Sequence, residues 1–259
     1  MSDSPVLISV KNGVGVFTIN RPDKFNCLSM AVHAELGKAI DRFESDASVR
    51  CILIRTEGKN FCTGADLEEV TGLRDSLEKL QGFITIGHRA LRRLETSPLP
   101  VVAAVQGLAL AGGLELMLAA DVVFAASTAR LGDQHSHFGL VPGWGGSQRL
   151  PKLIGRRQAL DLMFSARWLT AQEALGMGLV NYVVADDELR AAARDYCEKL
   201  AKKSRSGLAL MKKLTDRGLD MTLDQALQLE IDLAAPALQD ADVSEGLDAF
   251  INKRTPRYR

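Results

Sequence analysis

The sequence predicts an α/β fold in which a body of strands and helices is followed by a helical section. Short apolar runs typical of buried strands, such as VVAAV at 101–105, alternate with amphipathic stretches of helical period. After about residue 185 the strand signals stop, and four successive stretches carry only helical periodicity. A length of 259 residues suits one large domain, or one domain with an appendage.

Local patterns justify the elements in order. Asn12-Gly13 joins two strand-like runs and predicts a hairpin, because this pair favours tight turns between strands. Ser29 can cap a helix over about 30–43. We expect strands at 51–55, 101–105, 121–126 and 180–184, a charged helix over 74–95, and a helix starting at 113.

Composition narrows the function classes. The 32 basic and 32 acidic side chains give zero formal net charge, which argues against a nucleic-acid partner, RNA included. No apolar stretch approaches the roughly 20 residues that a membrane-spanning helix needs, so we expect no membrane partner. The four cysteines form no CxxC pair, and the first residues do not resemble a secretory signal. We therefore expect a cytoplasmic protein with reduced thiols.

The stretch LALAGGLELMLAAD, residues 108–121, places Glu115 alone in an apolar run after two glycines. Burial raises the pKa of an acid, which suits proton transfer near neutrality. A hydrogen-bonded structural glutamate, or a first-turn acid favoured by the helix dipole, is the alternative. The glycines either let the backbone approach a ligand or form plain tight turns. Neither a GK[ST] ending nor GxGxxG is present, so a phosphate loop is not indicated.

Four stretches carry a resemblance when taken in order. They are NRPDKFNCLS (20–29), NFCTGADL (60–67), AVQGLALAGGLELMLAADVVFA (104–125) and GLVPGWGGSQRLPKLIG (139–155). Together they resemble the enoyl-CoA hydratase/isomerase (crotonase) family. TAQEALGMGLVNYVV and the tail EGLDAFINKRTPRY extend the resemblance over nearly the whole chain.

This resemblance implies a crotonase-type spiral of ββα repeats with a C-terminal helical section. The catalytic, acyl-CoA-binding core would span residues 1–195, and the helical section would span 196–259. That section would serve oligomerisation and complete the CoA site in a homotrimer or homohexamer. The implied substrate is an acyl-CoA thioester, with no metal and no cofactor apart from the coenzyme A of the substrate.

The resemblance also assigns site residues. The backbone N–H groups of Ala65 and Gly112 map onto an oxyanion hole, which stabilises the enolate-like oxygen that forms when the α-carbon gains or loses a proton. Glu115 maps onto the first acid/base position. The resemblance implies that CoA or the substrate contacts six residues: Lys24, Thr63, Asp66, Leu67, Trp144 and Lys253. As plain structural residues, Lys24 would be a solvated turn lysine, Trp144 a core anchor and Lys253 a charge at a helix end.

The second acid/base position departs from the family pattern. Where hydratases carry a Gly-Gln-Pro-Glu-type stretch, this chain has Gly132-Asp133-Gln134-His135. His135 could serve as the acid/base group, since its unperturbed pKa is near 6.5. It could instead mark a changed reaction, a loss of catalysis, or a hydrogen-bonded structural histidine.

Two other chemistries can be imagined in the same stretch. On a strand, Asp133, His135 and His137 would share one face and could hold a metal, although no fourth ligand is evident. A Ser136–His137 nucleophile pair is disfavoured, because strand neighbours point apart and GxSxG is absent.

The sequence therefore predicts hydration of a 2-enoyl-CoA, with Glu115 and His135 as the catalytic residues. Isomerisation, or C–C cleavage or hydrolysis of a CoA thioester, is the first alternative, because of His135. A non-catalytic acyl-CoA-binding protein is the alternative from another class.

Overall fold

The structure, a computed structural model, describes residues 4–259. Its strands form a six-stranded sheet in the order β1-β2-β3-β4-β6-β9 and a three-stranded sheet in the order β5-β7-β8. The strands are β1 (Val6–Lys11), β2 (Val14–Ile19), β3 (Cys51–Thr56), β4 (Val101–Val105), β5 (Leu108–Leu110), β6 (Val122–Ala126), β7 (Arg130–Gly132), β8 (Leu169–Thr170) and β9 (Tyr182–Val184).

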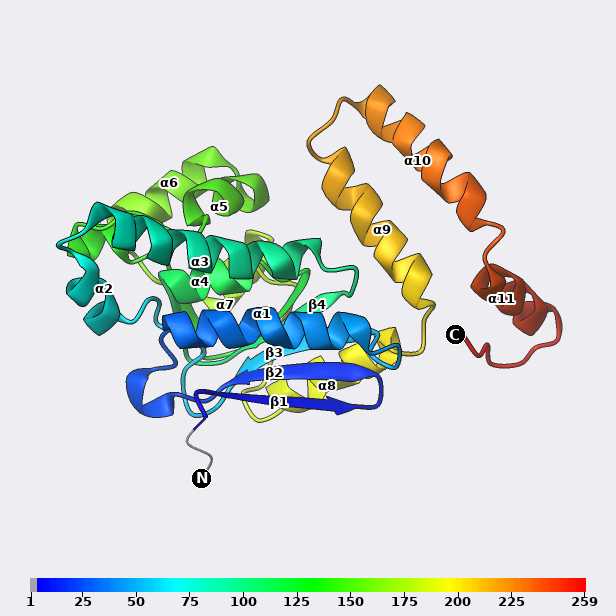
Figure 1. The fold of residues 1–259 in the computed structure, drawn as a ribbon, viewed down its shortest axis with the longest axis horizontal. Coiled ribbons are helices and arrows are strands. Elements are labelled where there is room, and N and C mark those ends of the chain that lie inside the picture. The colour runs from blue at the N-terminus through cyan, green and yellow to red at the C-terminus, as the bar shows by residue number, and fades with distance from the viewer. Residues whose placement is uncertain (1–3) are drawn as a thin grey trace.

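The helices follow the predicted alternation with strands and then continue alone to the C-terminus (Figure 1). They are α1 (Met30–Ser45), α2 (Leu67–Leu73), α3 (Leu77–Thr96), α4 (Gly112–Leu118), α5 (Gly146–Ile154), α6 (Arg156–Ser165), α7 (Ala171–Gly176), α8 (Leu189–Leu200), α9 (Arg205–Gly218), α10 (Leu223–Ala237) and α11 (Ala241–Ile251). Two short 3₁₀ helices, η1 (Pro22–Lys24) and η2 (His135–Phe138), complete the set.

The first two strands confirm the hairpin prediction. β1 and β2 pair antiparallel with Lys11 opposite Val14, which leaves Asn12 and Gly13 as a two-residue turn. Both turn residues have positive φ angles, 54° and 77°. Two positive φ angles define the turn type whose twist matches paired strands, and Asn-Gly adopts it at low cost. The other neighbours in the six-stranded sheet pair in parallel.

The chain winds as a spiral of ββα turns, as the resemblance implied. β4 lies in the large sheet and β5 in the small one, and α4 follows. β6 and β7 repeat this division. Two isolated bridges, Cys62 to Ala109 and Leu28 to Ala65, link the earlier turns of the spiral on the same side. This stacking places the loops after successive strands next to one another.

The expected helix over 74–95 is wrong at its start. Asp66 caps α2 through its side chain, and Ser76 caps α3 in the same way. The chain therefore forms two helices with a break between them, because each polar cap satisfies the free N–H groups of a new helix. The helix after the glycine pair begins at Gly112, one residue before the expected start.

The apolar core lies between the large sheet and the helices that cover it. Every residue of β2 is buried, as expected for an inner strand. α1 packs on α3 and on the first strands, and α8 packs on β3, β4 and β6. The expected boundary at residue 195 falls within α8, so the chain leaves the body only after this helix.

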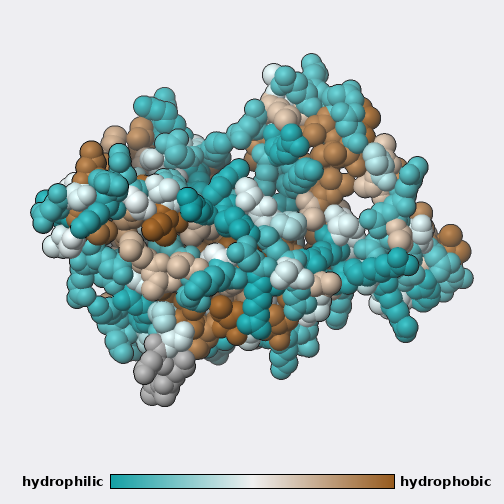
Figure 2. Space-filling model, in the orientation of Figure 1, coloured by the Kyte–Doolittle hydropathy of each residue, from teal (hydrophilic) through white to brown (hydrophobic). Residues whose placement is uncertain are grey.

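The C-terminal section, here α9 to α11, stands away from this body (Figure 1). Neither α9 nor α10 contains a buried residue. A polar anchor holds α9 to the body: Lys212 Nζ lies 2.8 Å from Asp121 Oδ2 and also donates to the carbonyl oxygens of Leu94 and Leu99. Figure 2 shows apolar surface over α9 and α10. The large apolar side chains exposed on α9 to α11 and their connections include Met211, Leu219, Leu223, Leu227, Ile231, Leu238, Leu247, Phe250 and Ile251.

Candidate functional site

A cavity of about 840 Å³ opens where the loops of successive spiral turns meet α2, α3 and η2. It collects nine of the ten site residues expected from the sequence. They are Lys24, Thr63, Ala65, Asp66, Leu67, Gly112, Glu115, His135 and Trp144. Lys253, just after α11, is exposed and does not line this cavity.

One wall of the cavity is backbone, and we call residues 62–66 and 110–113 the oxyanion wall. Ala65 pairs with Leu28, but that bridge uses Gly64 O and Asp66 N, which leaves the Ala65 N–H without a partner among the described residues. Gly112 begins α4, where the first-turn N–H groups have no acceptor within the helix. The wall thus presents two backbone donors of the kind that stabilise an oxyanion.

Glycines bring the two halves of the oxyanion wall together. A Cβ on Gly64 would lie 3.1 Å from Gly112 N, and a Cβ on Gly112 would lie 3.2 Å from Gly64 Cα. Gly64 also has a φ of 108°, which L side chains rarely adopt. Ala111, at the turn into α4, has a φ of 50°, and its N–H donates to Gly132 O. The loop before α4 is therefore pinned by its neighbours.

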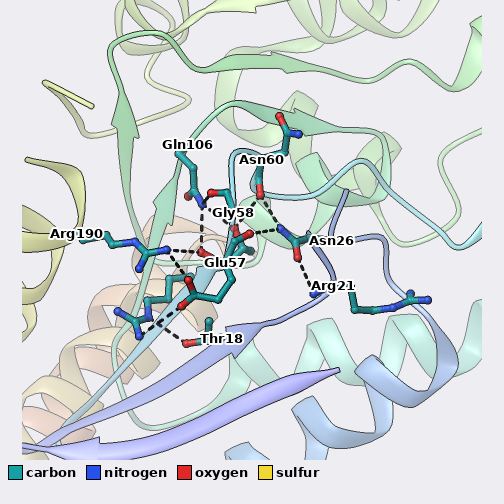
Figure 3. A network of polar contacts seen from close by, with 10 residues as sticks. Thr18, Arg21, Asn26, Glu57, Gly58, Asn60, Gln106 and Arg190 are labelled. Atoms are coloured by element: carbon teal, nitrogen blue, oxygen red, sulfur yellow. Dashed lines mark hydrogen bonds and ion pairs between the residues drawn. The ribbon is translucent and has the colours of Figure 1, made fainter. Parts of the chain in front are cut away.

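A polar network fixes the chain that leads into this wall (Figure 3). The buried Asn26 side chain accepts from Arg21 N at 2.9 Å, and it donates to Glu57 O at 2.8 Å and Asn60 O at 2.7 Å. Gln106 Nε2 adds a bond to Gly58 O at 3.3 Å. Buried amides that satisfy backbone groups rigidify a loop, so this network holds the approach to Ala65 in place.

The opposite wall consists of side chains, and we call Glu115 with residues 133–146 the acid/base wall. Glu115 is 1% exposed, and its Oε1 accepts from Trp144 N at 2.8 Å and Gly146 N at 2.7 Å. A Cβ on Gly146 would lie only 3.2 Å from Glu115, so glycine permits this approach. Burial raises the pKa of the Glu115 carboxyl, although the two N–H donors and His135 oppose the rise. Glu115 Oε2 accepts no such bond from residues 4–259.

His135 completes the acid/base wall. Its Nδ1 lies 2.9 Å from Asp133 Oδ1, and its Nε2 lies 3.8 Å from Glu115 Oε2. Burial lowers the pKa of His135, but the hydrogen bond and charge of Asp133 and the charge of Glu115 outweigh burial and raise it overall. The imidazole is thus held toward its charged form between two carboxylates. The gap to Glu115 exceeds hydrogen-bond length, and one water oxygen at about 2.8 Å from both atoms fits this spacing.

Asp133 to His137 do not form the strand that a shared metal-binding face would need. Gln134 and Gly139 both have positive φ angles and flank the η2 turn, so alternate residues do not share a face. Asp133 contacts His135 directly, and no cluster of three metal-ligating side chains occurs within residues 4–259. The Ser136 hydroxyl donates to Phe164 O, so it is not held by His137.

The residues expected to contact CoA differ in whether their side chains already bind other residues of the protein. Lys24 Nζ pairs with Glu68 Oε2 at 2.6 Å at the cavity edge, and both side chains are exposed. Asp66 is mostly committed to the fold, since it caps α2 and binds Arg21 at 2.8 Å. Leu67 is half-exposed. An exposed lysine, paired with Glu68, and an apolar side chain therefore lie at the same mouth of the cavity.

Asp133 is the residue that sequence reasoning missed as a partner of the site. The sequence analysis considered it only as a metal ligand. The usable signal was its position two residues before His135, because a short acid can bond the backbone N–H two residues on. Asp133 Oδ1 does lie 3.3 Å from His135 N. The contact between Asp133 and the His135 ring also depends on the αL conformation of Gln134, which no local sequence motif predicts.

The site combines two backbone N–H groups, unpartnered within residues 4–259, with a buried glutamate and histidine on a ββα spiral, an arrangement suited to forming an enolate-like thioester. The chain matches the enoyl-CoA hydratase/isomerase family over residues 9–259, and it belongs to that family of enzymes.

Individual relatives are similar over their full length. The "probable enoyl-CoA hydratase" of Bacillus subtilis is 36% identical over 255 residues, which is 98% of each chain. The "1,2-epoxyphenylacetyl-CoA isomerase" of Escherichia coli is 34% identical, covering 98% of this chain and 97% of that one. The crystal structure of an enoyl-CoA hydratase from Bacillus anthracis superimposes with a TM-score of 0.94 at 35% identity, covering 98% of this chain and 99% of that one.

Proposed function

We propose that this enzyme hydrates a 2-enoyl-CoA thioester, with Glu115 and His135 as its acid/base pair. The observation that carries the proposal is the 3.8 Å gap between Glu115 Oε2 and His135 Nε2, beside the free N–H groups of Ala65 and Gly112. A gap of this size suits one water held by both groups. The B. subtilis and B. anthracis hydratases support the same reaction class.

The raised pKa of each group suggests how the proton moves. Glu115, as the carboxylate, takes a proton from the water while the hydroxide adds to C3 of the substrate. Electron density moves to the thioester oxygen, where the N–H groups of Ala65 and Gly112 stabilise the enolate. His135, as the imidazolium, donates its proton to C2, which restores the thioester carbonyl. A proton passed from Glu115 to His135 returns both groups to their starting forms.

Asp133 acts in this scheme as a positioning residue. Its bond to Nδ1 selects which ring nitrogen faces the cavity, and its charge favours the imidazolium. The buried carboxylate thereby replaces solvent as the partner of a charged histidine. No cofactor is required apart from the coenzyme A of the substrate, and Lys24 at the cavity mouth would attract its phosphates.

We also propose that the enzyme assembles as a homotrimer or homohexamer in the cytoplasm. The exposed apolar side chains of α9 to α11 support association, because such patches usually mark contact surfaces. In such an assembly Lys253 would reach the CoA site of a neighbouring copy. None of the described helices is long and apolar enough to cross a membrane. Light scattering after size-exclusion chromatography measures the oligomer directly.

The proposed reaction is tested with crotonyl-CoA and the purified enzyme. Loss of the conjugated thioester absorbance, with a product heavier by one water in mass spectrometry, is the expected result. A product of unchanged mass with a moved double bond would instead identify an isomerase. Saturable binding without any product would identify an acyl-CoA-binding protein.

A further inference from the structure

The indole of Trp144 occupies the inner end of the cavity. Its side chain is 2% exposed, yet it lines the same cavity as Glu115 and Gly112. Its ring meets His33 of α1 edge-on at 4.6 Å and lies 5.3 Å from the ring of Phe83 in α3. The indole therefore fills the space between two helices directly behind the reacting groups.

Two glycines make room for this ring. A Cβ on Gly112 would lie 2.7 Å from Trp144 Cζ3, and a Cβ on Gly87, inside α3, would overlap Trp144 Nε1. Glycine inside a helix is unfavourable relative to alanine, so its presence at Gly87 needs a packing reason. Close approach of the indole supplies that reason. A glycine in α3 and a glycine in α4 thus both accommodate the indole of Trp144.

The position of the ring bears on the acyl group. Gly112 N–H is one of the two proposed oxyanion donors, and Trp144 N holds Glu115 at 2.8 Å. A thioester bound there would extend its acyl chain past the indole. We propose that Trp144 is a specificity-determining stop that limits the enzyme to short, unbranched 2-enoyl groups. This inference rests on the proposed hydratase function.

The indole packs among Phe83, Gly87 and His33, and the imidazole of His33 is 2% exposed. Burial lowers the pKa of His33 to about 4, so this ring is uncharged at neutral pH. Neither of its ring nitrogens has a partner among the described residues. Removing the indole would open space beside the uncharged His33 ring and the Phe83 ring for a longer acyl chain.

The test compares kcat/KM for crotonyl-CoA and 2-decenoyl-CoA. The wild-type enzyme should strongly prefer crotonyl-CoA. Trp144→Ala should shift the ratio toward 2-decenoyl-CoA by at least about tenfold, because one methylene in an apolar pocket is worth roughly 10–200-fold. Trp168→Ala is the matched control. Trp168 also lines the cavity, but it is 47% exposed at the rim, so its removal should leave the ratio unchanged.

A milder variant guards against a folding defect. Trp144→Phe keeps an aromatic ring against His33 and Phe83 and should give an intermediate shift in the ratio. Equal use of both substrates by the wild-type enzyme, or an unchanged ratio in both Trp144 variants, would overturn the inference while leaving hydration intact.

If no enoyl-CoA is turned over, binding measurements can still test the role of Trp144 separately from the proposed hydration. Butyryl-CoA and decanoyl-CoA carry no double bond, so calorimetric titration measures their affinity without chemistry. If no enoyl-CoA is hydrated but wild type binds butyryl-CoA more tightly, and Trp144→Ala gains affinity for decanoyl-CoA, the proposed reaction fails and the stop stands. If the affinity does not depend on acyl-chain length in any variant, the proposal that Trp144 limits chain length is wrong.

Discussion

The oxyanion wall and the acid/base wall of the site are built by different means. The oxyanion wall offers backbone N–H groups of Ala65 and Gly112, and it depends on glycines and on bridges between spiral turns. The acid/base wall offers the side chains of Glu115 and His135, which other side-chain and backbone groups hold in place. The fold fixes the positions of backbone N–H groups, whereas a side chain can be replaced by another without moving the backbone.

This difference teaches which part of the site decides the reaction. The oxyanion wall would stabilise an enolate-like thioester in any member reaction, hydration and isomerisation alike. The acid/base wall decides where protons and water go. In this chain that wall contains His135 of η2 bonded to Asp133, so under the proposed mechanism these two side chains, with Glu115, determine the choice between reactions.

The largest effect should come from Glu115→Gln. The amide cannot accept the proton of water, so kcat for crotonyl-CoA should fall by about 10²–10⁴-fold, the range for a general acid/base group. Affinity for butyryl-CoA should change little. Turnover within a few-fold of wild type would remove Glu115 from the mechanism.

The oxyanion wall can be broken with a pair of substitutions at one position. Gly112→Pro removes the N–H and should lower kcat by about 10²–10³-fold relative to Gly112→Ala. Both variants place a Cβ against the Trp144 ring, so Gly112→Ala controls for the crowding that they share. Circular dichroism checks the fold of each. Equal activity of the two variants would mean that the N–H of this residue does not serve the oxyanion.

The activity that depends on the acid/base wall should vary with pH, and Asp133→Asn tests the contact between Asp133 and His135. The raised pKa of His135 favours the imidazolium, and activity should be lost as the pH rises through the pKa of His135. The raised pKa of Glu115 should set the acid limb, because the carboxylate is needed and is lost as the pH falls.

Asp133→Asn removes the charge that raises the pKa of His135. The alkaline limb should therefore move to lower pH. The amide oxygen of the asparagine can still accept from His135 Nδ1, but without the negative charge the bond to the imidazolium is weaker, so kcat/KM should fall by roughly tenfold on that side. The profile of Asp133→Asn is compared with that of the small residual activity of His135→Gln, in which the alkaline limb should vanish. A profile that neither variant changes would exclude His135 as the titrating acid.

The smallest effect is expected at the mouth of the cavity. Lys24→Ala removes an exposed charge that Glu68 already partly neutralises, so KM for crotonyl-CoA should rise only about two- to fivefold. The rise should shrink as salt is added. Lys38→Ala is the control, because Lys38 also pairs with a glutamate but lies on α1, outside the cavity lining. Equal KM values for both variants would place the CoA phosphates elsewhere.

Much of the fold followed from local signals. Asn12-Gly13 gave the hairpin, Ser29 capped α1, and apolar runs marked the inner strands. These features depend on residues that are neighbours in the sequence. The helix α2 was missed and the start of α3 was placed three residues early, because the sequence analysis gave no weight to the caps at Asp66 and Ser76.

The site was predictable where short motifs carry it. TGAD and AGGLE indicated Ala65, Gly112 and Glu115 through the family resemblance. The contact of Asp133 with His135 needs the αL turn at Gln134, and this turn is supported by a bond to Ala166 O, more than thirty residues away in the chain. The arrangement of α9 to α11 was equally hidden, because helical periodicity does not say what an apolar face packs against.

The central claim is that Glu115 and His135 together deliver one water across the double bond. Incubation of the enzyme with crotonyl-CoA in deuterated water, followed by mass spectrometry of the product, tests it directly. The account predicts a 3-hydroxyacyl product that carries one deuterium at C2, and almost none of it from His135→Gln. Deuterium exchange or bond migration without added water in the wild-type enzyme would contradict the account and identify Glu115 as a lone proton shuttle.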